Sequence, residues 1–268
     1  MKLFFIPIFI VCCLFSACAG NKSLRDKKCS YLESVKLNFD AGEEALKAAD
    51  YEKAITYFQF VRSKYPFSQY AALSDLKIAD AKFDQKRWLD AASAYEVFIR
   101  LHPRHEQVSY ASFRIGVSYF NAIPDDFFLL PASTSRDQTF TKDALAALDR
   151  FLVQFPASDY VAEAKKMRLK LYSKLARNSL EIAAYYSKRG RHQAAFERYA
   201  SIENLYPESD ESAEALFKAA EICRLYLNDE EQAAELYLRI INTKKDSPYI
   251  EQARAHFGKL HTETESQD

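Results

Sequence analysis

A four-residue pattern recurs along this 268-residue chain and constrains its fold more than any other feature. In each copy an alanine is followed at +4 and +7 by a large apolar residue and at +12 by proline. The copies are Ala54-Phe58-Val61-Pro66, Ala91-Tyr95-Phe98-Pro103, Ala144-Leu148-Phe151-Pro156 and Ala195-Tyr199-Ile202-Pro207. Offsets of 4 and 7 place three side chains on one face of a helix, and proline ends that helix because it lacks an N–H. We therefore expect each copy to be the second helix of a helical hairpin.

The first helix of each hairpin is marked by a small residue. Gly42, Ala79 and Ala183 each lie 12 residues before a repeat alanine. A small residue at this point lets the two helices of a hairpin approach closely. This is the tetratricopeptide pattern, and a looser fifth copy begins at Ala233. The sequence thus predicts an all-α, tetratricopeptide-type solenoid of about five repeats.

The third repeat contains an insertion. Gly116 lies 28 residues before Ala144 instead of 12, and the 16 extra residues (28 − 12) fall within residues 122–140. Insertions in a solenoid form loops on one face, which is often the binding face. A loop without a function is the alternative, and the sequence leaves both open.

The N-terminus predicts export. Lys2 precedes an apolar run over residues 3–15, and Ser16-Ala17-Cys18 follows, which is the order of a secretory signal peptide. Cys18 in this setting resembles the lipidated first residue of bacterial lipoproteins, with an acyl anchor such as palmitate. The alternative is a secreted protein cut after Ala17 with a free cysteine. Because residue 19 is Ala and not Asp, the resemblance implies export to the outer membrane.

The expected organisation follows from these landmarks. It comprises a signal peptide (1–17), a lipidated cysteine with its tether (18–30), repeats 1–3 (31–172), repeats 4–5 (173–262) and a polar tail (263–268). An extended helical stretch after Pro156 is expected to join the two groups of repeats.

Composition and motif content argue against several classes of function. The chain has 37 basic and 37 acidic residues, so a basic surface for nucleic acid is not expected. We find no nucleophile with a base and an orienting residue, so we expect no enzyme and no cofactor. His102 and His105 share a loop without metal-ligand spacing, and no metal site is expected. Cys29 and Cys223 could form a disulfide, but the apolar helical context of Cys223 favours a buried free thiol.

Several longer runs point to one family. They are Tyr65-Pro66-Phe67, Phe98-Ile99-Arg100-Leu101-His102-Pro103, Ser135-Arg136-Asp137, Phe155-Pro156-Ala157-Ser158-Asp159-Tyr160 and Ala184-Tyr185-Tyr186-Ser187-Lys188-Arg189-Gly190. Together with the lipoprotein signal, and over roughly residues 30–210, the chain resembles the BamD family of outer-membrane β-barrel assembly lipoproteins.

The resemblance implies a scaffold on the periplasmic face of the cell outer membrane, held there by its lipid anchor. Its partners would be a BamA-like barrel protein, other assembly lipoproteins and unfolded β-barrel precursors. The C-terminal repeats of this family contact BamA, and the N-terminal repeats are thought to receive the terminal signal of a precursor. A tetratricopeptide lipoprotein serving another envelope complex, such as a secretin or cell-wall machinery, is the alternative.

Two groups of residues are candidates for partner binding. Arg198 is the single charge at a repeat position that otherwise holds Tyr57, Ala94 and Ala147, and a guanidinium can bind a carboxylate in a fork. A solvated surface arginine is the alternative. In the N-terminal repeats, an aromatic groove could hold an extended peptide, although aromatic residues at helical spacing are more often core. The candidates for that groove are Tyr65, Phe67, Tyr70, Tyr110 and Phe113.

Overall fold

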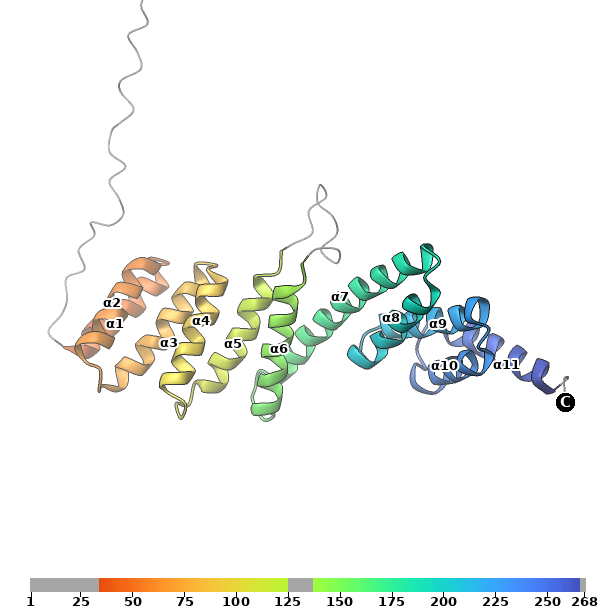
Figure 1. The fold of residues 1–268 in the computed structure, drawn as a ribbon. Coiled ribbons are helices and arrows are strands. Elements are labelled where there is room, and N and C mark those ends of the chain that lie inside the picture. Colours follow the sequence, from red (N-terminus) through yellow and green to blue (C-terminus); the bar gives the residue numbers. More distant parts are fainter. Residues whose placement is uncertain (1–33, 125–136, 266–268) are drawn as a thin grey trace, which may run out of the picture.

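The computed structural model describes residues 34–124 and 137–265, and all regular structure in these ranges is helical. Five hairpins and a final helix stack in one row (Figure 1). The hairpins are α1 (Val35–Lys47) with α2 (Tyr51–Lys64), α3 (Gln69–Asp84) with α4 (Trp88–Leu101), α5 (Val108–Asn121) with α6 (Thr139–Gln154), α7 (Val161–Lys188) with α8 (His192–Leu205), and α9 (Glu211–Ile222), continued by the π-helix η3 (Cys223–Leu227), with α10 (Glu230–Thr243). Helix α11 (Ile250–Glu265) packs on α10 and closes the row. The all-α solenoid of about five repeats is confirmed.

The repeat prolines end the second helices as expected. Pro66, Pro103, Pro156 and Pro207 each lie two residues beyond the last residue of α2, α4, α6 and α8. The residue before a proline is disfavoured in the helical conformation, so each helix stops one residue before that position. A short segment, which we call a link, then connects each second helix to the first helix of the next hairpin.

The repeat pattern also forms the core. The five repeat alanines, including that of the looser copy, are fully buried. Position 42 requires glycine, because a Cβ there would lie 2.7 Å from Cε1 of Phe58. The helices of the first hairpin can therefore be this close only with glycine at position 42.

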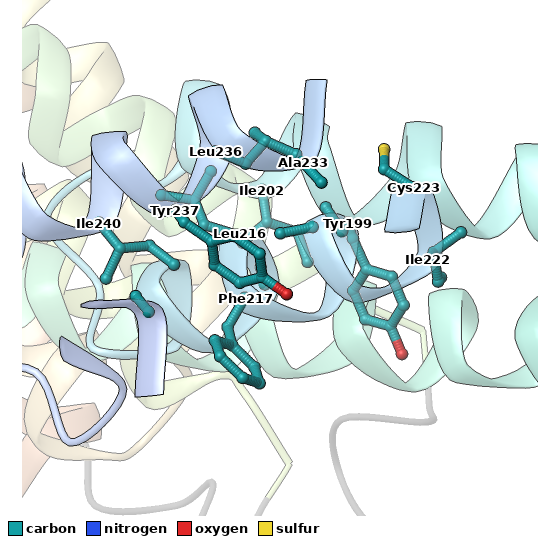
Figure 2. Close-up of a cluster of buried hydrophobic side chains, with 14 of the residues drawn as sticks. Tyr199, Ile202, Leu216, Phe217, Ile222, Cys223, Ala233, Leu236, Tyr237 and Ile240 are labelled. Carbon is teal, nitrogen blue, oxygen red and sulfur yellow. The ribbon is translucent and has the colours of Figure 1, made fainter. Parts of the chain in front are cut away.

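Helix α7 is shared by two parts of the core. A cluster from α5, α6 and α7 includes Leu171, and the cluster of the C-terminal repeats begins at Ala176 on the same helix. The expected division between residues 172 and 173 falls inside this continuous 28-residue helix. The two groups of repeats therefore have separate cores without a loop between them. Figure 2 shows part of the C-terminal cluster, including Tyr199, Ile202 and Tyr237.

The two layers and two edges of the row have different roles. Odd-numbered helices of neighbouring hairpins touch one another, as α1 does with α3 and α7 with α9, so they form the inner face. The links between hairpins lie along one edge, the lower one for the first hairpins in Figure 1, and the turns within hairpins lie along the other. We name these the link edge and the turn edge.

The insertion of the third repeat lies between α5 and α6, as expected, but its residues 125–136 are outside the described ranges. The signal peptide, Cys18, Cys29, the tether and the last three residues are also outside them. Across the described ranges, no helix combines the length and the apolar character needed to cross a membrane.

Candidate functional site

Three of the five aromatic candidates lie at the first link, between α2 and α3. Phe67 is fully exposed. Tyr65 is half-buried, with its ring centre 6.2 Å from that of Phe60. Tyr70 is half-buried against the core, 5.1 Å from the ring centre of Phe39. Only Phe67 offers a whole ring to a partner.

The other two candidates belong to the packing of α5. Phe113 is 4% exposed and stacks on Tyr160, with ring centres 5.0 Å apart and planes 9° from parallel. The expectation that Phe113 lines an open groove is therefore wrong, because its face of α5 packs against α6 and the start of α7. Tyr110 is half-buried and its hydroxyl is committed to Asp80. The five residues do not form one aromatic groove.

A polar network on the inner side of repeats 2 and 3 was not predicted from the sequence. Asp80 on α3 accepts hydrogen bonds at Oδ1 from Tyr95 Oη at 2.6 Å and from Tyr110 Oη at 2.9 Å. Arg114 on α5 donates from Nε to Tyr95 Oη at 3.1 Å, and its guanidinium carbon lies 3.6 Å from the ring centre of Phe83. The network joins α3, α4 and α5, and it holds a cation over an aromatic ring.

Burial of this network keeps its tyrosines neutral. Desolvation is the main cause that raises the pKa of Tyr95 and of Tyr110, and the charge of Asp80 raises both further. The hydroxyls therefore remain donors at any physiological pH. The sequence signal that could have located the network is a charged residue close to the small residue of each first helix. Asp80 directly follows Ala79 on α3, and Arg114 lies two residues before Gly116 on α5.

Arg198 lies on the surface of the fourth repeat. It is exposed on α8 and makes no ion pair with any other residue in the described ranges, while its carbonyl accepts a hydrogen bond from Ser201 Oγ at 2.8 Å. Its guanidinium can therefore receive a carboxylate from a partner in fork geometry.

A pocket of about 290 Å³ opens between the inner-face helices of repeats 4 and 5. Its base includes Tyr199 and Ile222, which are almost fully buried, and its rim includes the exposed Leu225 and Tyr226 of η3. The ring of Tyr226 stacks on His192, with centres 3.8 Å apart and planes 6° from parallel. An exposed aromatic ring fixed in this way loses little conformational freedom when a partner covers it.

His102 and Cys223, which the sequence analysis considered as candidates, both make contacts within the fold. His102 Nε2 lies 3.0 Å from Oδ2 of the buried Asp75, whose Oδ1 accepts from Arg62 at 3.1 Å. Cys223 is a buried free thiol, as favoured, and burial raises its pKa to about 11. Among the described residues, no group of three or more His, Cys, Asp or Glu side chains could hold a metal ion.

Comparison with known proteins assigns this chain to a family. The family model described as "Outer membrane lipoprotein" (YfiO) matches residues 33–238, which is most of the chain and nearly all of the solenoid. The chain belongs to this family of outer membrane lipoproteins.

Several curated relatives carry the same name. The outer membrane protein assembly factor BamD of Neisseria meningitidis serogroup A is 31% identical over 196 residues, which is 71% of this chain and 73% of the relative. BamD of Caulobacter vibrioides is 26% identical over 216 residues, covering 81% of this chain and 68% of the relative. The resemblance seen in the sequence is thereby confirmed at the level of the family.

Proposed function

We propose that this chain is a lipoprotein scaffold of the outer-membrane β-barrel assembly machinery, which helps β-barrel precursors fold into the outer membrane. The match of an outer membrane lipoprotein family to residues 33–238 carries this proposal, since it spans the whole N-terminal array and reaches into α10. The relatives named as assembly factors support it. A row of hairpins with two exposed faces is an architecture for binding proteins rather than for catalysis.

The attachment to the membrane is assigned to Cys18. The signal-like run before it supports processing at this residue. Several acyl chains would form a stable anchor, whereas one chain would bind only marginally. The folded repeats would then lie on the periplasmic face of the outer membrane.

The C-terminal repeats are assigned to the BamA-like barrel protein. Arg198 on α8 supplies an unpaired guanidinium for a carboxylate of that partner. The role proposed for the N-terminal repeats is to bind the terminal signal of β-barrel precursors.

The decisive experiment is purification of the tagged protein from detergent-solubilised outer membrane, followed by mass spectrometry. We expect a BamA-like barrel protein and other assembly lipoproteins in stoichiometric amounts. Recovery of a secretin or of cell-wall enzymes in their place would contradict the assignment. It would favour a tetratricopeptide scaffold for another envelope complex.

A further inference from the structure

Two exposed apolar side chains mark the link edge of the first two repeats. Phe67 in the first link is fully exposed, and Leu101 at the end of α4 is 57% exposed. Covering apolar surface gains about 25 cal/mol per Å² removed from water, so Phe67 and Leu101 offer a favourable apolar contact to a partner surface.

Basic residues lie within three positions of these two side chains along the chain. Lys64, Arg100 and Arg104 are exposed, and none of them makes an ion pair with another residue that the structure describes. Glu106 is the acidic residue exposed beside them, so this stretch of edge carries a net positive charge.

The third and fourth links lack this positive charge. Aligned on their prolines, Arg104 of the second link corresponds to Ala157 in the third link and to Glu208 in the fourth. Asp159 and Asp210 correspond to Glu106 of the second link. The last turn of α6, just before the third link, also exposes an apolar residue, Val153, at 81%. Apolar exposure thus recurs along the edge, and among the first four links it is combined with positive charge only in repeats 1 and 2. The fifth link carries Lys244 and Lys245 beside Asp246 but exposes no large apolar side chain among the described residues.

The chain enters the fold at this same basic end. Helices α1 and α2 are antiparallel, so the start of α1 at Val35 lies at the edge where α2 ends (Figure 1). The contact of Phe39 with Tyr70, at 5.1 Å between ring centres, joins the second turn of α1 to the first turn of α3 near this edge. Residues 19–34 would connect it to Cys18 and can span at most about 55 Å when fully extended.

We propose that this part of the link edge, with Phe67, Leu101, Lys64, Arg100 and Arg104, docks on an anionic phospholipid surface. The ring of Phe67 enters the interface, and the basic side chains contact lipid phosphates. Each basic residue near such a surface contributes about fivefold to the binding constant. The proposal rests on the proposed lipidation of Cys18, because the anchor brings this edge to the membrane. Docking would then fix the orientation of the first repeats, which a lipid on a tether alone leaves free.

Vesicle binding of the unlipidated chain from Ala19 onward tests the edge separately from the anchor. This chain retains every residue that the structure describes, and acylation at Cys18 cannot contribute to its binding. We expect sedimentation with vesicles of phosphatidylcholine mixed with phosphatidylglycerol, and much weaker sedimentation with phosphatidylcholine alone. Lys64→Glu/Arg104→Glu should weaken binding at least 25-fold, about fivefold for each lost positive charge. Lys47→Glu/Arg191→Glu makes the same change of charge on the turn edge and should leave binding unchanged apart from a small nonspecific effect.

Apolar contact is tested by a second matched pair and by fluorescence. Phe67→Ser should weaken binding, whereas Val153→Ser, just before the third link, should not. Trp88 at the start of α4 lies on the turn edge and reports on that edge in the unchanged protein. Phe67→Trp should add an emission that shifts to the blue with anionic vesicles, while the emission of Trp88 alone does not shift.

Equal binding by Lys64→Glu/Arg104→Glu and by the control pair would overturn the proposal. So would an unshifted emission from Phe67→Trp in the presence of bound vesicles. If the edge variants bind vesicles normally but lose partners in the purification described above, the edge is a protein-binding surface and the membrane assignment fails. Loss of acylation at Cys18 would remove the anchor without changing any of these vesicle results.

Discussion

Leu148 occupies the space that a side chain at position 116 would need: its Cδ2 lies 2.6 Å from where a Cβ on Gly116 would be. Leu148 is fully buried on α6, and Gly116 is in the middle of α5. The third hairpin therefore closes around glycine, even though a long insertion separates its two helices.

Gly116→Ala is expected to destabilise the protein by about 1–3 kcal/mol, because overpacking outweighs the better helix propensity of alanine. Gly258→Ala on α11 is the control, since a Cβ there meets no atom within 4 Å. It should stabilise the protein by up to about 1 kcal/mol. Urea unfolding measures both, and equal effects of the two substitutions would contradict the close packing at Leu148.

Stability is expected to fall in alkaline solution because of the network around Asp80. The pKa values of Tyr95 and Tyr110 are raised in the folded state by burial first and by Asp80 second. Unfolded tyrosines ionise near pH 10, so the contribution is complete below about pH 10 and is lost as the pH rises above it. The slope approaches about 1.4 kcal/mol per pH unit for each tyrosine. Tyr110→Phe should reduce this slope between about pH 10 and 11, and an unchanged slope would contradict the role of the network.

Arg177 supports the junction of repeats 4 and 5. Its Nε donates to Glu211 Oε1 at 2.6 Å, and the side chain of Glu211 is only 9% exposed. Arg177→Ala would leave this carboxylate without its charged donor, at an expected cost of about 1–3 kcal/mol. The more exposed pair of Arg254 with Glu251 is the comparison, and Arg254→Ala should change stability by less than about 0.5 kcal/mol. Thermal unfolding of the two variants side by side gives the answer.

Arg198→Leu is expected to keep the fold and to weaken binding to the partner. Because the side chain is exposed, stability should change by less than about 0.5 kcal/mol. Affinity for the periplasmic domains of the BamA-like protein should fall by the roughly 2–5 kcal/mol typical of truncating a desolvated charge pair. Lys47→Leu, at the other end of the row, is the matched control. Unchanged affinity of Arg198→Leu would remove this residue from the interface, and a lower melting temperature would give it a structural role.

Cys18→Ala is expected to abolish incorporation of labelled fatty acid and to release the protein from membranes. The reason is that Cys18 directly follows the apolar run and Ser16-Ala17, which is the position of the lipidated residue in a lipoprotein signal. Continued labelling of Cys18→Ala would refute the assignment.

The repeats were predictable because they depend on local spacing. Alanine, two apolar residues and proline at fixed offsets determine where a helix begins to pack and where it ends, and Pro66 and Pro207 behave alike although 141 residues separate them (207 − 66). The exposure of individual side chains was less predictable, because it depends on the neighbouring hairpin. Phe67 and Phe113 are both aromatic residues near a link, yet one is fully exposed and the other 4% exposed.

The polar network escaped prediction for a related reason. Asp80 and Arg114 are 34 residues apart (114 − 80), and charged residues on solvated helix faces are common in this chain. Only the stacking of α3 on α5 through α4 brings them to the same tyrosines. The π-helix η3 also has no signal in the apolar pattern, although it places Tyr226 against His192.

The continuity of α7 makes this helix a rigid spacer. With 28 residues it is about 42 Å long, and it has no break where one core ends and the next begins. A partner that pulls on repeats 4 and 5 therefore turns α7 as a rod, and repeat 3 moves with it. A flexible linker would absorb such a displacement, whereas this helix transmits it, so a change of angle between the two halves of the scaffold requires bending α7 or shifting it against α5 and α6.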